Sequence, residues 1–367
     1  MKNKRIVIKF GTSVLTDGTH QLKHSRMMHL VTQCAELHRL GHELILVSSG
    51  AIAAGKQSLG FENLPVVMAR KQMLAAVGQS HLMHIWGKFF DIYDLHVGQI
   101  LLTRGDMENR KRYLNARDTL DALLAQQVIP IINENDAIAT AEIKLGDNDN
   151  LSALVSMLAD ADLLILLTDQ PGLFTADPRL DPDAKLIPEV NRIDQIADLQ
   201  IGHSQSGLGV GGMITKLQAA DYARRAGTDV VIAAGMTENV IIKIVGGHAV
   251  GTRIPALTTS LDSRKRWILG GPPPAGKITV DKGAAKALQE GGHSLLPAGI
   301  ISVEGQFNRG AAVFIIDPEK NELARGIVRY AGSDLQQIKG CQSEQIAEQL
   351  GYYHGPVIVH RNDLILL

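Results

Sequence analysis

The first 255 residues alternate short, almost wholly apolar runs with longer stretches in which apolar residues recur at helical spacing. Apolar runs of five or six residues predict buried strands, and the longer stretches predict helices that pack one face on a core. Strands are predicted at residues 5–10, 43–47, 97–102, 128–132, 163–168 and 229–233. Helices are predicted at residues 25–40, 66–93 with at least one break, 109–124, 151–158 and 216–226.

This order of elements predicts an α/β fold, a three-layer αβα sandwich with a mainly parallel sheet. Strands that are apolar along their whole length are buried on both faces, so helices must cover both sides of the sheet. Right-handed crossovers bring the carboxyl ends of parallel strands to one edge, and open sheets of this kind bind ligands outside that edge.

The pattern changes after residue 255. Residues 270–276 read Gly-Gly-Pro-Pro-Pro-Ala-Gly, and three prolines exclude a helix interior or a central strand. Short apolar runs then predict strands at 277–280, 300–304, 312–317, 322–330 and 357–360, with one helix at 283–290. We therefore expect an α/β domain over residues 1–255, a linker over 256–275, and a small β-rich domain with a C-terminal tail over 276–367.

Composition narrows the class of protein. The 367 residues are 45% hydrophobic and 20% charged, and the net charge of −1 argues against a basic nucleic-acid binder. The only two cysteines, Cys34 and Cys341, are distant in sequence, which fits a reducing compartment better than a disulfide framework. The longest apolar runs fall far short of the ~18 residues that a membrane span needs. The N-terminal apolar run suits a strand better than a signal peptide, so we expect a cytoplasmic protein.

Polar or small residues directly follow four of the predicted strands, at residues 9–13, 48–51, 133–136 and 168–172. Each segment alone is compatible with a plain turn. If the sheet is parallel, however, all four lie at the same edge, and turns do not repeatedly require lysine, serine, asparagine and aspartate. The four segments together therefore predict a binding site at the carboxyl edge of the sheet.

Two glycine-containing segments are candidates for phosphate binding. Gly11 follows the strand that carries Lys9, where backbone amides and a positive charge suit an anion. Residues 207–216 form a second glycine-rich segment, which ends at Lys216 beside a predicted helix. Its glycine spacing formally matches the dinucleotide-binding motif, but no strand precedes it. A nicotinamide dehydrogenase and a plain surface loop stay open as weaker alternatives.

Residues 146–150 place two carboxylates and two amides before an apolar helix. A helix N-cap would explain one such residue but not four. The spacing is not that of a calcium loop, and the histidines show no metal-ligand spacing, so we predict no metal ligands from the protein. Asp149 is the candidate for positioning the lysines, and Asp147 and Asn148 are candidates for binding a zwitterion.

Taken in order, the segments resemble the glutamate 5-kinase family of the amino acid kinase superfamily. The likeness covers the whole first domain, and the second domain resembles the PUA module, a small pseudo-barrel. The matching segments are residues 9–15, 48–55, 114–119, 132–136, 146–153, 167–169 and 209–216. Each motif alone is moderately specific for this family, whereas the complete set in this order is strongly specific for it.

The resemblance implies ATP-dependent phosphorylation of the side-chain carboxylate of L-glutamate, the first step towards proline. Lys9, Lys216 and Asp149 are then expected to be catalytic, and Mg²⁺ would be held mainly by phosphates and water. The residues expected at the nucleotide are Lys9, Gly11, Thr168, Asp169, Val210, Gly211, Gly212, Met213, Ile214, Thr215 and Lys216. The residues expected at the acceptor are Ser49, Asn133, Asp136, Asp147 and Asn148.

The family also implies partners. A homo-oligomer (dimer or tetramer), feedback inhibition by proline and transient contact with glutamyl phosphate reductase are expected, with residues 115–142 as a proline-sensing region. The alternatives are another amino acid kinase, acting on aspartate, acetylglutamate, carbamate or a nucleoside monophosphate, and RNA binding by the second domain. From residue 275 onward there are nine Lys or Arg and ten Asp or Glu, which lacks the basic footprint of an RNA-binding surface.

Overall fold

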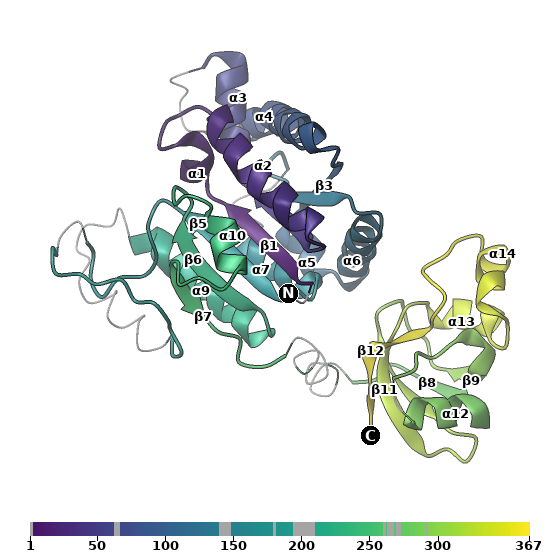
Figure 1. Cartoon of the computed structure of the whole chain (residues 1–367). Helices are drawn as coiled ribbons and strands as arrows, with labels where there is room; N and C mark the ends of the chain where they lie inside the picture. The colour runs from purple at the N-terminus through teal and green to yellow at the C-terminus, as the bar shows by residue number, and fades with distance from the viewer. Residues whose placement is uncertain are drawn as a thin grey trace. The chain divides into compact units, whose positions relative to one another are not determined.

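The structure, a computed structural model, describes residues 3–61, 67–138, 148–178, 181–193, 210–259, 262, 268, 273–290 and 292–367. The chain divides into two compact units, Met1–Ser260 and Leu261–Leu367. Figure 1 shows the course of the chain through both. Within the described parts, no helix is both long enough and apolar enough to cross a lipid bilayer.

The first unit is built on a seven-stranded sheet in the order β3-β4-β2-β1-β5-β6-β7. Every neighbouring pair is parallel except β6 and β7. The strands are β1 (Arg5–Phe10), β2 (Glu43–Ser48), β3 (Val97–Leu102), β4 (Ile129–Glu134), β5 (Leu163–Thr168), β6 (Asp229–Ala234) and β7 (Thr252–Ile254). The predicted mainly parallel sheet is confirmed, and the lysine-bearing strand β1 lies at its centre.

Helices cover both faces of this sheet, as the apolar strands predict. They are α1 (Thr12–Thr16), α2 (His24–Arg39), α3 (Ala51–Leu59), α4 (Met68–Phe90), α5 (Arg104–Glu108), α6 (Arg110–Ala125), α7 (Asn148–Leu158), α9 (Val210–Arg225) and α10 (Val240–Val245). Ile6 and Ile8 of β1 pack in one core with α2, α4 and α10, whereas Val7 packs in a second core with α6, α7 and α9. Because successive side chains of a strand point to opposite faces, β1 separates two buried cores.

Three helix predictions differ from the structure. The helix predicted over residues 66–93 is continuous from Met68 to Phe90 and then becomes a 3-10 turn, η1 (Asp91–Tyr93). The helix predicted at 151–158 begins three residues earlier, at Asn148, and the helix predicted at 216–226 begins six residues earlier, at Val210. Four helices of this unit, α1, α3, α5 and α10, and the short strand β7 were not predicted from the sequence, nor were two short helices of the second unit, at Gly332–Ile338 and Ile346–Leu350.

The second unit is a five-stranded sheet in the order β12-β11-β10-β8-β9, with its own core. Its strands are β8 (Lys277–Val280), β9 (Ile300–Glu304), β10 (Ala312–Ile316), β11 (Glu322–Val328) and β12 (Val359–Leu366). Its helices are α12 (Lys282–Gln289), α13 (Gly332–Ile338) and α14 (Ile346–Leu350), with 3-10 turns η2 (Pro297–Gly299) and η3 (Ser343–Gln345). The last strand, predicted to end at residue 360, continues to Leu366.

Candidate active site

The four polar segments meet at the carboxyl edge of the first sheet. They follow β1, β2, β4 and β5, and these four strands are consecutive neighbours in the sheet. The register pairs Phe10 at the end of β1 with Ser48 of β2 and with Leu167 of β5. The predicted convergence of these segments is therefore present.

At this edge, Asp149 holds the two lysines singled out from the sequence. Lys9 Nζ, from β1, lies 2.5 Å from Asp149 Oδ1. Lys216 Nζ, from the second turn of α9, lies 3.0 Å from Asp149 Oδ2. Asp149 belongs to the first turn of α7 and is fully buried, and Lys9 is 5% exposed. Two cations distant in the chain thus share one carboxylate.

The charge state of Asp149 follows from its surroundings. Burial alone would raise the pKa of the Asp149 carboxyl, because desolvation disfavours the charged form. The charges of Lys9 and Lys216 and their hydrogen bonds outweigh this effect and hold the pKa of Asp149 below its ordinary value. Asp149 therefore stays ionised at neutral pH, and it fixes both ammonium groups.

The second glycine-rich segment is not a loop throughout, because residues 210–216 form the first two turns of α9. Gly212 O accepts hydrogen bonds from Thr215 Oγ1 at 3.0 Å and from Lys216 Nζ at 3.1 Å. Thr215 Oγ1 also lies 3.4 Å from Asp149 Oδ2, and Met213 packs against the second core. The first turn of a helix has N–H groups without intrahelical partners, so Val210 to Met213 present a helix N-terminus.

The backbone amide of Gly11 was expected to bind a phosphate, but in the structure it has another role. Its N–H donates to Leu167 O at 3.2 Å, so this amide links β1 to β5 and is not offered to a phosphate. A Cβ at Gly11 would lie 3.2 Å from Leu167 O and 3.8 Å from Lys9 Nζ. The missing side chain therefore leaves space beside the Lys9 ammonium group. At the end of β5, Thr168 Oγ1 donates to Asp169 Oδ1 at 2.9 Å.

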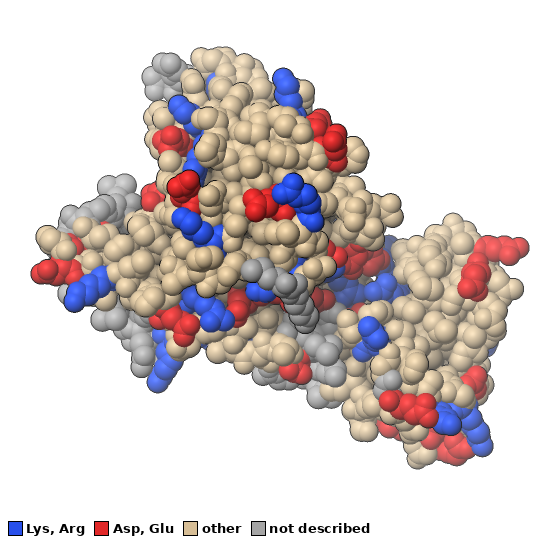
Figure 2. Space-filling model, in the orientation of Figure 1, with Lys and Arg blue, Asp and Glu red and all other residues tan. Residues whose placement is uncertain are grey.

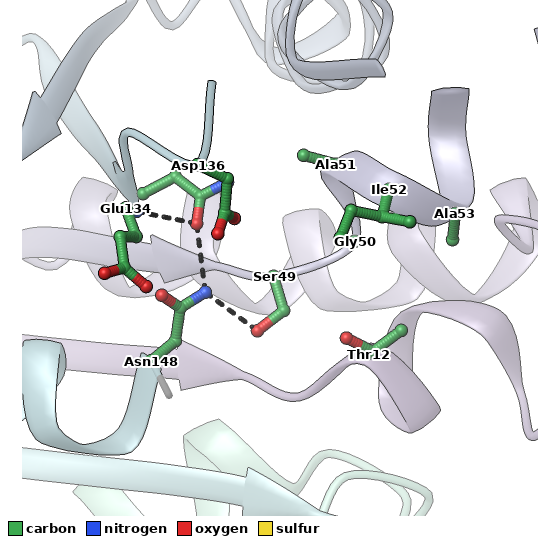
Figure 3. Close-up of a pocket in the computed structure, with 10 residues that line it drawn as sticks. Thr12, Ser49, Gly50, Ala51, Ile52, Ala53, Glu134, Asp136 and Asn148 are labelled. Atoms are coloured by element: carbon green, nitrogen blue, oxygen red, sulfur yellow. Dashed lines mark hydrogen bonds between the residues drawn. The ribbon is translucent and has the colours of Figure 1, made fainter. Parts of the chain in front are cut away.

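A cavity of about 190 Å³ lies beside these charges and is lined by residues of α1, β4, α3 and α7 and of the segments that directly follow β2 and β4 (Figure 3). It brings together Ser49, Asn133, Asp136 and Asn148, four of the five residues expected at the acceptor. Asp147, the fifth, lies outside the described residues. The other lining residues are Thr12, Gly50, Ala51, Ile52, Ala53 and Glu134.

Backbone groups fix the orientation of the amides in this cavity. Asn148 Nδ2 donates to Ser48 O at 3.1 Å, to Ser49 Oγ at 2.9 Å and to Asn133 Oδ1 at 3.0 Å. Because a backbone carbonyl only accepts hydrogen bonds, the Asn148 atom that faces Ser48 O must be the nitrogen. Asn133 Oδ1 also accepts from the N–H of Glu134 at 2.9 Å. The Asn148 carbonyl is thus the group that this side chain offers a ligand within the described cavity (Figure 3).

The comparison with known proteins agrees with this geometry. The amino acid kinase family matches residues 4–234, and the PUA domain matches residues 276–350. A glutamate 5-kinase of Photobacterium profundum is 59% identical over 362 residues, which cover 99% of this chain and 96% of that protein. A glutamate 5-kinase of Sodalis glossinidius is 56% identical over 364 residues, 99% of both chains. The chain belongs to the amino acid kinase family, among the glutamate 5-kinases.

Among solved structures, a UMP kinase from Bacillus anthracis aligns with TM-score 0.48 at 16% identity, over 70% of this chain and 97% of that chain. The segment matched by the amino acid kinase family contains every site residue named above.

Two residues that line the cavity, Glu134 and Thr12, were given no role from the sequence, although they belong to the motifs quoted there. Their position at the carboxyl ends of β4 and β1 is the feature that could have identified them, since Glu134 is the last residue of β4 and Thr12 lies two residues beyond β1. Among the described residues, no group of three or more His, Cys, Asp or Glu is arranged to hold a metal ion.

Proposed function

We propose that this amino acid kinase transfers the γ-phosphoryl group of ATP to the side-chain carboxylate of L-glutamate, giving glutamyl 5-phosphate for proline biosynthesis. The observation that carries the proposal is the pair of lysine ammonium groups held by buried Asp149 at the sheet edge. Beside them lies a cavity with carboxylate and amide groups suited to an amino acid. The high identity to glutamate 5-kinases supports the same substrate.

The chemistry explains why the site needs cations and no general base. A glutamate side chain has a pKa of about 4.3, so the acceptor is already ionised at pH 7. The difficulty is its approach to an anionic phosphoryl group. At 4 Å two unit charges repel by about 1 kcal/mol in water and about 4 kcal/mol at an effective dielectric of 20. Lys9 and Lys216 offset this repulsion and stabilise the charge on the transferring phosphoryl oxygens.

The nucleotide is proposed to lie where β1, β5 and α9 meet. The N-terminal amides of α9 suit its phosphates, and the space beside Gly11 lets them reach Lys9. Thr168 and Asp169, at the end of β5, are proposed to lie near the nucleotide. We expect Met213 and Ile214 to contribute through the backbone, because Met213 packs into the core.

The residues present fit a magnesium ion that arrives with the nucleotide. Both oxygens of Asp149 contact lysines, which commits that carboxylate to positioning cations and not to metal ligation. Mg²⁺ keeps several waters and binds phosphate oxygens readily, so phosphates and water would supply most of its ligands. When bound, it would neutralise part of the phosphate charge.

The acceptor is proposed to lie in the cavity of Figure 3 with its α-ammonium group towards Asp136, Glu134 and the Asn148 carbonyl. The amides of Asn133 and Asn148, both expected at the acceptor from the sequence, would be the obvious donors to its α-carboxylate. Because Asn148 Nδ2 donates to protein acceptors, we assign the α-carboxylate instead to the first turn of α3, whose residues line the same cavity.

A substrate panel tests this function. The purified chain would be incubated with ATP, Mg²⁺ and one acceptor at a time, and ADP release would be measured. The acceptors are L-glutamate, L-aspartate, N-acetyl-L-glutamate, carbamate and UMP. We expect L-glutamate to have the highest kcat/KM, and hydroxylamine should trap its acyl phosphate. A preference for any other acceptor would refute the assignment.

The domain boundaries, the location in the cell and the partners of the protein are predictions from the sequence. We propose a catalytic domain over residues 1–255, a linker over 256–275 and a PUA-like domain over 276–367. We also propose a cytoplasmic homo-oligomer, inhibition by proline, and transient contact with glutamyl phosphate reductase. Part of the expected proline-sensing region, residues 139–142, lies outside the described residues. The nine basic and ten acidic residues from residue 275 onward do not favour RNA binding as the role of the second unit.

A further inference from the structure

Helices α3 and α4 approach each other at two glycines. A Cβ at Gly78 of α4 would lie less than 3.0 Å from Ala51 O and from Gly55 N, both on α3. A Cβ at Gly55 would lie equally close to Leu74 O on α4. The obstacles are backbone atoms, which cannot rotate away as a flexible side chain can. Any side chain at either glycine would therefore push the two helices apart.

The end of α3 that meets Gly78 is also a wall of the acceptor cavity. Gly50, Ala51, Ile52 and Ala53 line that cavity (Figure 3). Ala51 also carries the carbonyl oxygen that a Cβ at Gly78 would meet. A change in the spacing of α3 and α4 would thus move the first turn of α3 relative to the β-strand ends. The part of α3 that would move is the part proposed to hold the acceptor.

Helix α4 also contacts the other residues of the cavity wall. Gln79, directly after Gly78, accepts a hydrogen bond through Oε1 from Asn133 Nδ2 at 2.8 Å. Asn133 in turn accepts from Asn148. About two turns further along α4, Trp86 Nε1 donates to Ser48 Oγ at 3.0 Å. Consecutive residues of α4 therefore touch both sides of the cavity, although neither Gly78 nor Gln79 lines it.

We propose that Gly78 and Gln79 are positioning residues for the acceptor. Gly78 sets the distance of the α3 N-terminal turn from the strand ends, and Gln79 holds the Asn133–Asn148 amide pair. This inference rests on the proposed function, since it names the residues that shape the glutamate site. It predicts that changes at these two positions weaken the use of glutamate and leave the use of ATP unaltered.

The first test is Gly78→Ala, with Gly87→Ala as its matched control on the same helix. A Cβ at Gly87 would meet only Val97 Cγ2, at an ordinary 3.8 Å. Circular dichroism and thermal melting would verify folding before steady-state kinetics. For Gly78→Ala we expect the KM for glutamate to rise at least about tenfold, with the KM for ATP within about twofold. Gly87→Ala should change neither. A folded Gly78→Ala protein with a smaller rise would overturn the role of Gly78.

Gln79→Met is the second test, and it decides the matter if Gly78→Ala does not fold. It keeps the length of the side chain and removes the acceptor for Asn133 Nδ2. We expect the KM for glutamate to rise at least about fivefold at an unchanged KM for ATP. A smaller rise, or an equal rise in both constants, would contradict the proposal. If the unaltered chain fails to phosphorylate glutamate, the proposed function fails instead, whatever the variants do.

Discussion

At the scale of single residues, the site depends on one buried carboxylate between two lysines. A buried charge is costly, and replacing such ion pairs by apolar residues is often neutral or stabilising. The burial of the Lys9–Asp149–Lys216 group is therefore better explained by a catalytic role, in which its cations bind a phosphoryl group, than by a contribution to folding stability. The residue types could be inferred from the sequence, because lysine and aspartate beside strand ends and glycines suit phosphate chemistry. That both lysines share a single carboxylate depends on the packing of α7 and α9 and is visible only in the structure.

Lys216→Ala tests the catalytic part of this group. We expect kcat to fall by about 10²- to 10³-fold, because one preorganised cation is lost from the transition state. The KM for glutamate should stay within about threefold, since Lys216 does not line the acceptor cavity. Lys282→Ala, an exposed lysine of the second unit, is the control and should keep wild-type kinetics. Wild-type turnover in Lys216→Ala would remove the role assigned to this lysine.

Asp149→Asn tests how much the ion pairs of the Asp149 carboxylate with Lys9 and Lys216 stabilise the protein. Loss of the carboxylate leaves buried Lys9 and partly buried Lys216 without their shared counter-charge, so the free energy of unfolding at pH 7 should fall by about 3 kcal/mol. The pKa of Asp149 is lowered in the folded protein. Its stabilisation is therefore present at neutral pH and is lost as the pH falls below about 4, through the folded-state pKa. Urea unfolding between pH 7 and pH 3 should show the gap between the two proteins narrowing towards acid. A gap independent of pH would contradict this origin.

At the scale of elements, the apolar pattern predicted which segments pack but not where the helices begin. Six of the seven strands of the sheet were predicted to within two residues from their apolar runs, whereas the three-residue strand β7 was missed. The first turns of α7 and α9 carry asparagine, aspartate and glycine, which are equally typical of loops. Tertiary contacts, such as those of Asn148 with Ser48 and Ser49, make the first turn of α7 helical. Helix α3 was missed altogether, because its nine residues include only two large apolar side chains, Ile52 and Leu59, which are too few to show a helical period.

The two ends of α3 offer a paired test at this scale. Gly50 and Gly60 flank the helix with φ values of +99° and +68°, a region that favours glycine. Gly50→Ala and Gly60→Ala should each destabilise the protein by about 1 kcal/mol. Only Gly50 lines the acceptor cavity, so only Gly50→Ala should also raise the KM for glutamate. Thermal melting and steady-state kinetics would measure both effects. Equal glutamate KM values for the two variants would show that the start of α3 does not contribute to acceptor binding.

At the scale of the whole molecule, the two compact units have separate hydrophobic cores, and all the described site residues belong to the first. On the face drawn in Figure 2, basic and acidic side chains are interspersed over each unit, which fits the net charge of −1. The family match over residues 276–350 assigns the second unit to the PUA domains.

A fragment of residues 1–260 tests the independence of the first unit. Because this unit has its own cores and contains the described site, we expect the fragment to fold cooperatively. Its kcat for glutamate should lie within about threefold of that of the full chain. The same assay with added proline would show whether the second unit affects inhibition. A folded fragment without activity would mean that residues beyond 260 complete the catalytic site.

The most direct measurement is a crystal structure with a non-hydrolysable ATP analogue, Mg²⁺ and L-glutamate. The γ-phosphate should lie within hydrogen-bond distance of the ammonium groups of both Lys9 and Lys216. The glutamate side-chain carboxylate should face that phosphate from the cavity lined by Ser49, Asp136 and Asn148. A triphosphate bound away from either lysine, or a glutamate molecule outside this cavity, would contradict the central claim.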